Sequence, residues 1–65
     1  MKKLYDFLFV LTEQSENDGE EILVEASTLS EADAILEKNG FSDEEYRYIT
    51  KMSTAEGERL GLDTY

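Results

Sequence analysis

Cysteine, histidine and proline are absent from this chain of 65 residues. Without cysteine the chain forms no disulfides and no thiolate metal sites, and this absence fits a reducing compartment. Without histidine it lacks the commonest metal ligand and the usual general base near neutral pH. A domain of this size has a small core, which is usually reinforced by disulfides, metals or oligomerisation. Oligomerisation is the one reinforcement left open, so we expect a single domain, residues 1–65, that forms a homodimer.

Basic residues are scarce, because six Lys and Arg stand against sixteen Asp and Glu, a formal net charge of −10. This balance argues against nucleic acid or an anionic membrane as a direct partner and favours a basic protein surface. No run approaches the roughly 18 apolar residues that span a bilayer. We do not expect the start MKKLYDFLFVL to be a secretion signal, since Asp6 interrupts it and polar EQSEND follows. We therefore expect a cytoplasmic protein.

Three segments have the composition of β-strands. Residues 4–12 are rich in Tyr, Phe and Val and are apolar on both faces, whereas residues 20–26 and 45–52 alternate apolar and polar side chains. A polar loop ending in Asp18-Gly19 separates the first two segments, which indicates a β-hairpin. One face of the first segment consists of Tyr5, Phe7, Phe9 and Leu11.

Two segments carry helix signals. Thr28 with Glu31, or Ser30 with Asp33, supplies an N-cap pattern, and Gly40 can end the helix in the left-handed conformation with Phe41 folding back. A second Ser-x-x-Glu pattern begins at Ser53 and predicts a short terminal helical turn over 53–60. Gly57 weakens this turn.

The order β-β-α-β predicts an α+β fold with a three-stranded antiparallel sheet in the spatial order 2-1-3 and one helix on one face. We expect a core of Leu29, Ala32, Ile35, Leu36 and Phe41 packed on the sheet. The opposite face has no cover within the chain. We assign Tyr5, Phe7, Phe9 and Leu11 to this open face, as a dimer contact or an apolar patch for a partner.

Three segments carry partial signals of a chemical site, and each also has an ordinary structural explanation. Residues 14–25 resemble a calcium loop, but Gln14 stands where a ligating Asp is expected and no helices flank the loop. Carboxylate pairs at 20–25 or 43–45 are suited to acid–base catalysis only if burial separates their pKa values. Tyrosines such as Tyr46 and Tyr48 would need a basic groove to bind single strands. We therefore expect no catalytic residues, no metal site and no cofactor.

The acidic residues are the remaining feature, because they cluster in the hairpin loop and around the helix. A rigid array of carboxylates can imitate phosphates and occupy the basic groove of a nucleic-acid-binding protein. The charge also exceeds the magnitude of about 2–8 that keeps a small domain soluble. The residues predicted to bind the partner are Glu16, Asp18, Glu20, Glu21, Glu31, Asp33, Glu37, Asp43, Glu44 and Glu45.

Two functions fit this sequence best. The first is a non-enzymatic inhibitor that acts by nucleic-acid mimicry, and the alternative is a homodimeric structural or interaction module without inhibitory role. In its profile, MKKLYDFLFVL followed by acidic ENDGEE and SDEEY, the chain resembles small acidic proteins of phages and mobile elements. That resemblance implies inhibition of host-defence or DNA-processing enzymes by DNA mimicry and supplies no individual functional residues.

Overall fold

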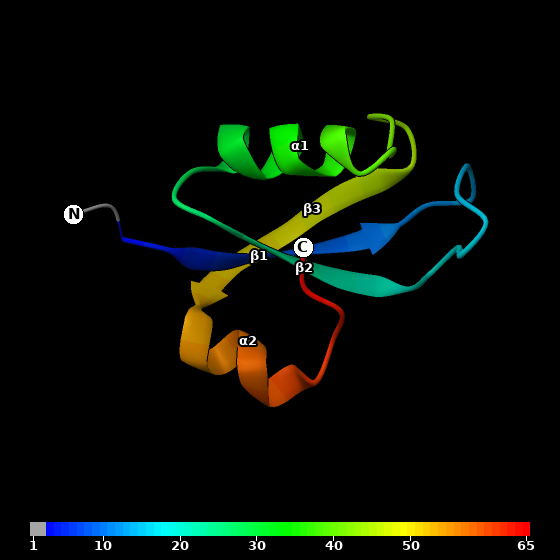
Figure 1. Cartoon of the computed structure of the whole chain (residues 1–65). Coiled ribbons are helices and arrows are strands. Elements are labelled where there is room, and N and C mark those ends of the chain that lie inside the picture. Colours follow the sequence, from blue (N-terminus) through cyan, green and yellow to red (C-terminus); the bar gives the residue numbers. More distant parts are fainter. Residues whose placement is uncertain (1–2) are drawn as a thin grey trace.

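The structure is a computed structural model that describes residues 3–65 (Figure 1). Its elements are β1 (Tyr5–Leu11), β2 (Glu21–Ala26), α1 (Leu29–Lys38), β3 (Tyr46–Ser53) and α2 (Thr54–Leu60). The three strands form one antiparallel sheet in the order β2-β1-β3, which confirms the predicted fold and topology. The two helices lie on opposite faces of the sheet (Figure 1).

The pairing of β1 is regular with β2 and irregular with β3. Phe7 of β1 lies opposite Val24 of β2 and Lys51 of β3, whereas Phe9 lies opposite Ile22 and Tyr48. The pairing with β3 therefore skips one residue between Leu8 and Phe9, as in a β-bulge. Because of this bulge, Tyr48 and Lys51 face the same side of the sheet although they are separated by an odd number of positions.

Both ends of α1 follow from local sequence. The Thr28 hydroxyl accepts a hydrogen bond from the Glu31 amide at 3.2 Å, which satisfies a free amide of the first turn. At the other end Gly40 takes a φ of 93°, and the amide of Phe41 donates to the carbonyl of Leu36 at 3.0 Å. Gly40 and Phe41 thus end the helix as the sequence predicts.

The main core lies between α1 and the sheet. It includes Ala32 and Leu36 from α1, with Ile35 and Phe41 packed against it as partly buried side chains. Leu29 was predicted to belong to this core, but it is 38% exposed. Leu29 is the first residue of α1, whereas the buried residues Ala32 and Leu36 lie farther along the helix.

The assignment of Tyr5, Phe7, Phe9 and Leu11 to an open face is wrong. Phe7, Phe9 and Leu11 are buried in the core on the α1 side, and Tyr5 packs against them half-buried. These aromatic rings are the largest side chains on β1, and they fill the space beneath α1. Phe7, Phe9 and Leu11 are therefore not exposed as an apolar patch.

The other face of the sheet is covered by the chain that follows β3. Ser53 and Glu56 form a reciprocal capping box at the start of α2, as the Ser-x-x-Glu pattern predicts. Leu8 and Leu23 are buried on this side of the sheet. After α2, the chain runs beside β2, where Thr64 forms a parallel bridge with Leu23. Within residues 3–65, no helix is long and apolar enough to cross a membrane.

Candidate protein-binding surface

The hairpin loop between β1 and β2 is held by its own backbone. Its hydrogen bonds run from the Gly19 amide to the Leu11 carbonyl at 2.8 Å and from the Glu20 amide to the Asn17 carbonyl at 3.0 Å. Gly19 has a φ of 86°, a conformation that favours glycine and so explains the Asp-Gly pair. The loop is thus an ordered support for its carboxylates. Its exposed acids are Glu13, Glu16, Asp18 and Glu20.

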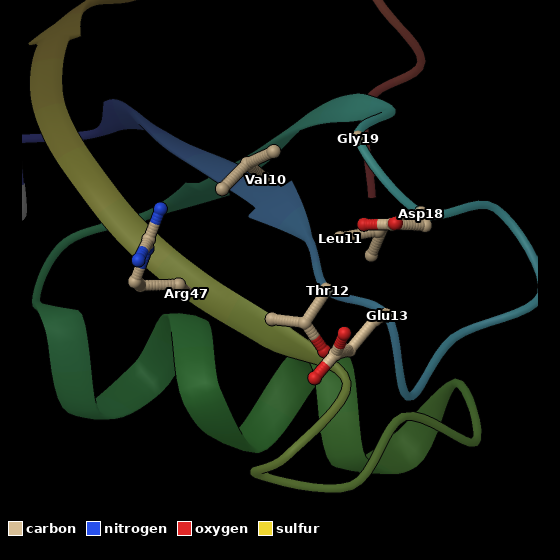
Figure 2. A pocket seen from close by; sticks show the side chains of 7 residues that line it. All are labelled: Val10, Leu11, Thr12, Glu13, Asp18, Gly19 and Arg47. Atoms are coloured by element: carbon tan, nitrogen blue, oxygen red, sulfur yellow. The ribbon is translucent and has the colours of Figure 1, made fainter.

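A second acidic segment, the connection of residues 42–45, is fixed against the base of this loop. The amide of Thr12 donates to the carbonyl of Glu45 at 2.9 Å, and the Thr12 hydroxyl donates to the carbonyl of Glu44. Figure 2 shows Thr12 and Glu13 next to this connection. Two acidic segments that are far apart in the sequence are therefore joined at one end of the molecule.

Tyr46 links α1 to the same region. Its ring is buried and packs edge-to-face on Phe9, with 5.3 Å between ring centroids, while its hydroxyl donates to Oδ1 of Asp43 at 3.4 Å. Burial, with the negative charges of Asp33, Asp43 and Glu37, raises the pKa of Tyr46 to about 12. The acids of α1 and of the 42–45 connection thus surround one buried phenol.

We call this region the acidic end. It is formed by the hairpin loop, the start of β2, the connection before β3 and one side of α1. Its residues are Glu16, Asp18, Glu20, Glu21, Asp33, Glu37, Asp43 and Glu44.

Two of the predicted partner-binding residues have structural roles instead. The carboxylate of Glu31 accepts hydrogen bonds from the amide and the hydroxyl of Ser27 at 3.1 and 2.5 Å, at the opposite end of α1. The carboxylate of Glu45 accepts from the amide and the hydroxyl of Ser42, each at 3.1 Å. Both carboxylates serve local turns, so we do not include Glu31 and Glu45 in the acidic end.

An open hollow of about 430 Å³ lies at the base of the hairpin loop (Figure 2). Arg47 of β3 lines this hollow together with the acidic residues Glu13 and Asp18. Sequence reasoning missed Arg47, because only the register between β1 and β3 places it opposite Val10. The lining residues are Val10, Leu11, Thr12, Glu13, Asp18, Gly19 and Arg47.

The calcium-loop interpretation does not match the backbone. Glu25, which would supply the last ligand, lies inside β2 opposite Asp6 of β1, so residues 14–25 do not form one continuous loop. Within residues 3–65, no three acidic side chains are grouped so that they could hold a metal ion.

Comparison of this chain with protein-family models, with curated proteins and with solved structures finds no match. Any hypothesis about function therefore depends on the chemistry of the acidic end.

Proposed function

We propose that this chain is a non-enzymatic binding protein whose acidic end occupies a basic surface of a nucleic-acid-binding protein and so inhibits it. The observation that carries the proposal is the pair of hydrogen bonds from Thr12 to the carbonyls of Glu44 and Glu45. These bonds hold two exposed acidic segments together at one end of the molecule. A fixed array loses less conformational entropy on binding than carboxylates on a mobile loop.

The net charge of the chain supports the same proposal. Six basic residues are set against sixteen acidic ones in the whole chain. Two of these basic residues lie on β3: Lys51, 4.4 Å from the centre of the Tyr5 ring, and Arg47, beside the hollow. The negative field at the acidic end attracts a basic partner over distances of about a Debye length, so salt weakens the attraction.

The expectation of a sheet-to-sheet homodimer loses its basis in the fold. It depended on an open apolar face of β1, but one face is packed under α1 and the other carries buried Leu8 beneath the chain after β3. A dimer through another surface stays a prediction that a concentration-dependent melting temperature tests.

The test begins with capture of partners on the immobilised chain at low salt. The captured protein is then purified, and its binding is measured with and without duplex DNA or RNA as a competitor. We expect DNA or RNA to displace the chain and added salt to weaken binding steeply. Binding that is insensitive to salt, or that occurs together with nucleic acid on the same partner, contradicts the proposal.

Two variants with equal charge separate a local site from net charge. The acidic-end variant replaces exposed acids whose side chains have no structural hydrogen bond in residues 3–65: Glu16→Gln, Asp18→Asn and Glu44→Gln. The control variant replaces exposed acids elsewhere in the chain: Glu25→Gln, Glu58→Gln and Asp63→Asn. We expect the first variant to lose affinity and the second to retain most of it. Equal losses in both would show that only net charge matters.

A further inference from the structure

Asp6 is a buried carboxyl that the proposed function does not use. It lies in the middle strand of the sheet, is 2% exposed, and its side chain points to the α2 side. No hydrogen-bond donor of residues 3–65 reaches its Oδ1 atom. A buried carboxylate without a donor is unfavourable, whereas its protonated form is neutral and tolerates burial far better.

Helix α2 is shaped to fit directly over this carboxyl. Gly57 is buried, and a Cβ atom placed on it would lie 1.8 Å from Oδ2 and 2.5 Å from Cγ of Asp6. Only glycine therefore lets the helix backbone approach so closely. Gly57 lowers the helix propensity of α2, but it also allows α2 to pack closely on Asp6.

Two acidic groups act on Asp6 from neighbouring elements. Glu25 lies opposite it on β2, Glu58 approaches from α2, and β3 places the uncharged Met52 opposite. The chain after α2 reaches β2 through backbone atoms of Asp63 and Tyr65. Burial, followed by repulsion from Glu25 and Glu58, raises the pKa of Asp6 above its ordinary 3.8. The charged form of Asp6 is thus disfavoured as long as α2 is docked.

We propose that Asp6 and Gly57 form a proton-sensitive latch, in which neutral Asp6 holds α2 and residues 61–65 on the sheet and ionised Asp6 favours their release. The docked state binds the proton more tightly than the released state. The contribution of Asp6 to docking is therefore complete below the ordinary aspartate pKa, where the docked population is largest. It falls as pH rises through the interval up to the raised value.

Release would uncover a second, specific surface. Leu8 and Leu23 are buried on this side of the sheet, and the amides of Leu23 and Glu25 donate to the carbonyls of Asp63 and Tyr65 at 2.9 and 3.1 Å. Undocking residues 54–65 exposes these leucines and leaves the outer edge of β2 unpaired. The latch thus controls access to an apolar sheet face and a strand edge, independently of the acidic end.

The test is amide hydrogen exchange of the whole chain, followed by NMR between about pH 4 and about pH 7. The amides of Leu23, Glu25 and Tyr65 report the docked segment, and the amide of Leu11, bonded to Glu20 at 2.8 Å, reports the hairpin. After correction for intrinsic exchange, we expect the protection of the docked segment to fall relative to Leu11. The fall should reach at most about tenfold per pH unit within the titration interval.

The matched variant is Asp6→Asn, which keeps the shape of the side chain and removes its titration. We expect the protection of Leu23, Glu25 and Tyr65 in this variant to be independent of pH. An equal pH-dependence in the variant, or a constant protection in the wild type, overturns the latch. If Asp6→Asn fails to fold, the Asp6 carboxyl resonance of the wild type decides. The fall in the protection of Leu23 must level off at the pH where this carboxyl titrates, and a fall that ends elsewhere overturns the proposal.

Discussion

Replacing Gly57 by alanine is the sharpest test of how α2 packs on the sheet. In an exposed helix, Gly→Ala stabilises by about 1 kcal/mol because alanine has the higher helix propensity. Here the new methyl group would lie 1.8 Å from Oδ2, 2.5 Å from Cγ and 2.8 Å from Cβ of Asp6. Overpacking costs about 1–3 kcal/mol, and so deep an overlap belongs at the upper limit. We therefore expect Gly57→Ala to lower the free energy of unfolding by about 2 kcal/mol, the difference between these two terms.

A double-mutant cycle isolates the cause. Asp6→Ala removes the carboxyl but keeps Cβ, which would still lie 2.8 Å from the new methyl group, so in that background Gly57→Ala should be close to neutral. The coupling between the two positions is then about 2 kcal/mol, measured by urea denaturation followed by far-UV circular dichroism. Stabilisation by Gly57→Ala in the wild-type background, or the same effect in both backgrounds, would refute the close packing of Gly57 on Asp6.

Three further predictions concern the core, a buried phenol and a helix cap. Leu36 is completely buried, so Leu36→Ala should lower the free energy of unfolding by about 2–5 kcal/mol. Leu29 is 38% exposed, so Leu29→Ala should lower it by less than about 1 kcal/mol. Similar losses for the two variants in urea denaturation would contradict the assigned core. The pKa of Tyr46 is about 12 in the folded chain against 10.0 as its ordinary value, so unfolded chains lose this proton first as pH rises. Stability should therefore fall between these two values by at most about 1.4 kcal/mol per pH unit, and Tyr46→Phe should remove this contribution. Ser53→Ala should cost about 1 kcal/mol by removing the acceptor for the Glu56 amide, and an unchanged melting curve would exclude the capping box.

The sequence predicts much of the fold because its signals are local. The alternation in β2 and β3, the Asp18-Gly19 turn and the Gly40-Phe41 helix end each depend on neighbouring residues. The order 2-1-3 then follows from connection rules, since the apolar strand β1 belongs in the middle.

The face of β1 covered by α1 was not predictable in the same way. Both faces of β1 are mostly apolar, so a period of two distinguishes Phe7 from Leu8 without showing which one lies under the helix. The structure resolves this by packing the rings of Phe7 and Phe9 under α1 and burying Leu8 on the α2 side. The fit between Asp6 and Gly57 is a contact between distant parts of the chain, and neither residue signals it alone.

The candidate surface was predictable in composition but not in arrangement. The sequence predicts that the hairpin loop is polar and exposed, and Glu16 and Asp18 are exposed. It does not show that Thr12 joins the loop to the 42–45 connection, because this contact forms only when β1 and β3 pair. It also cannot show that the carboxylates of Glu31 and Glu45 are used by neighbouring serines.

The central claim is that a basic partner binds at the acidic end. Its most direct test is the dissociation constant of the captured partner at several salt concentrations, measured for the wild type, the acidic-end variant and the control variant. We expect a steep loss of affinity with salt in the wild type and in the control variant, and weaker binding with a flatter salt dependence in the acidic-end variant. The same salt dependence and affinity in all three proteins would contradict the claim.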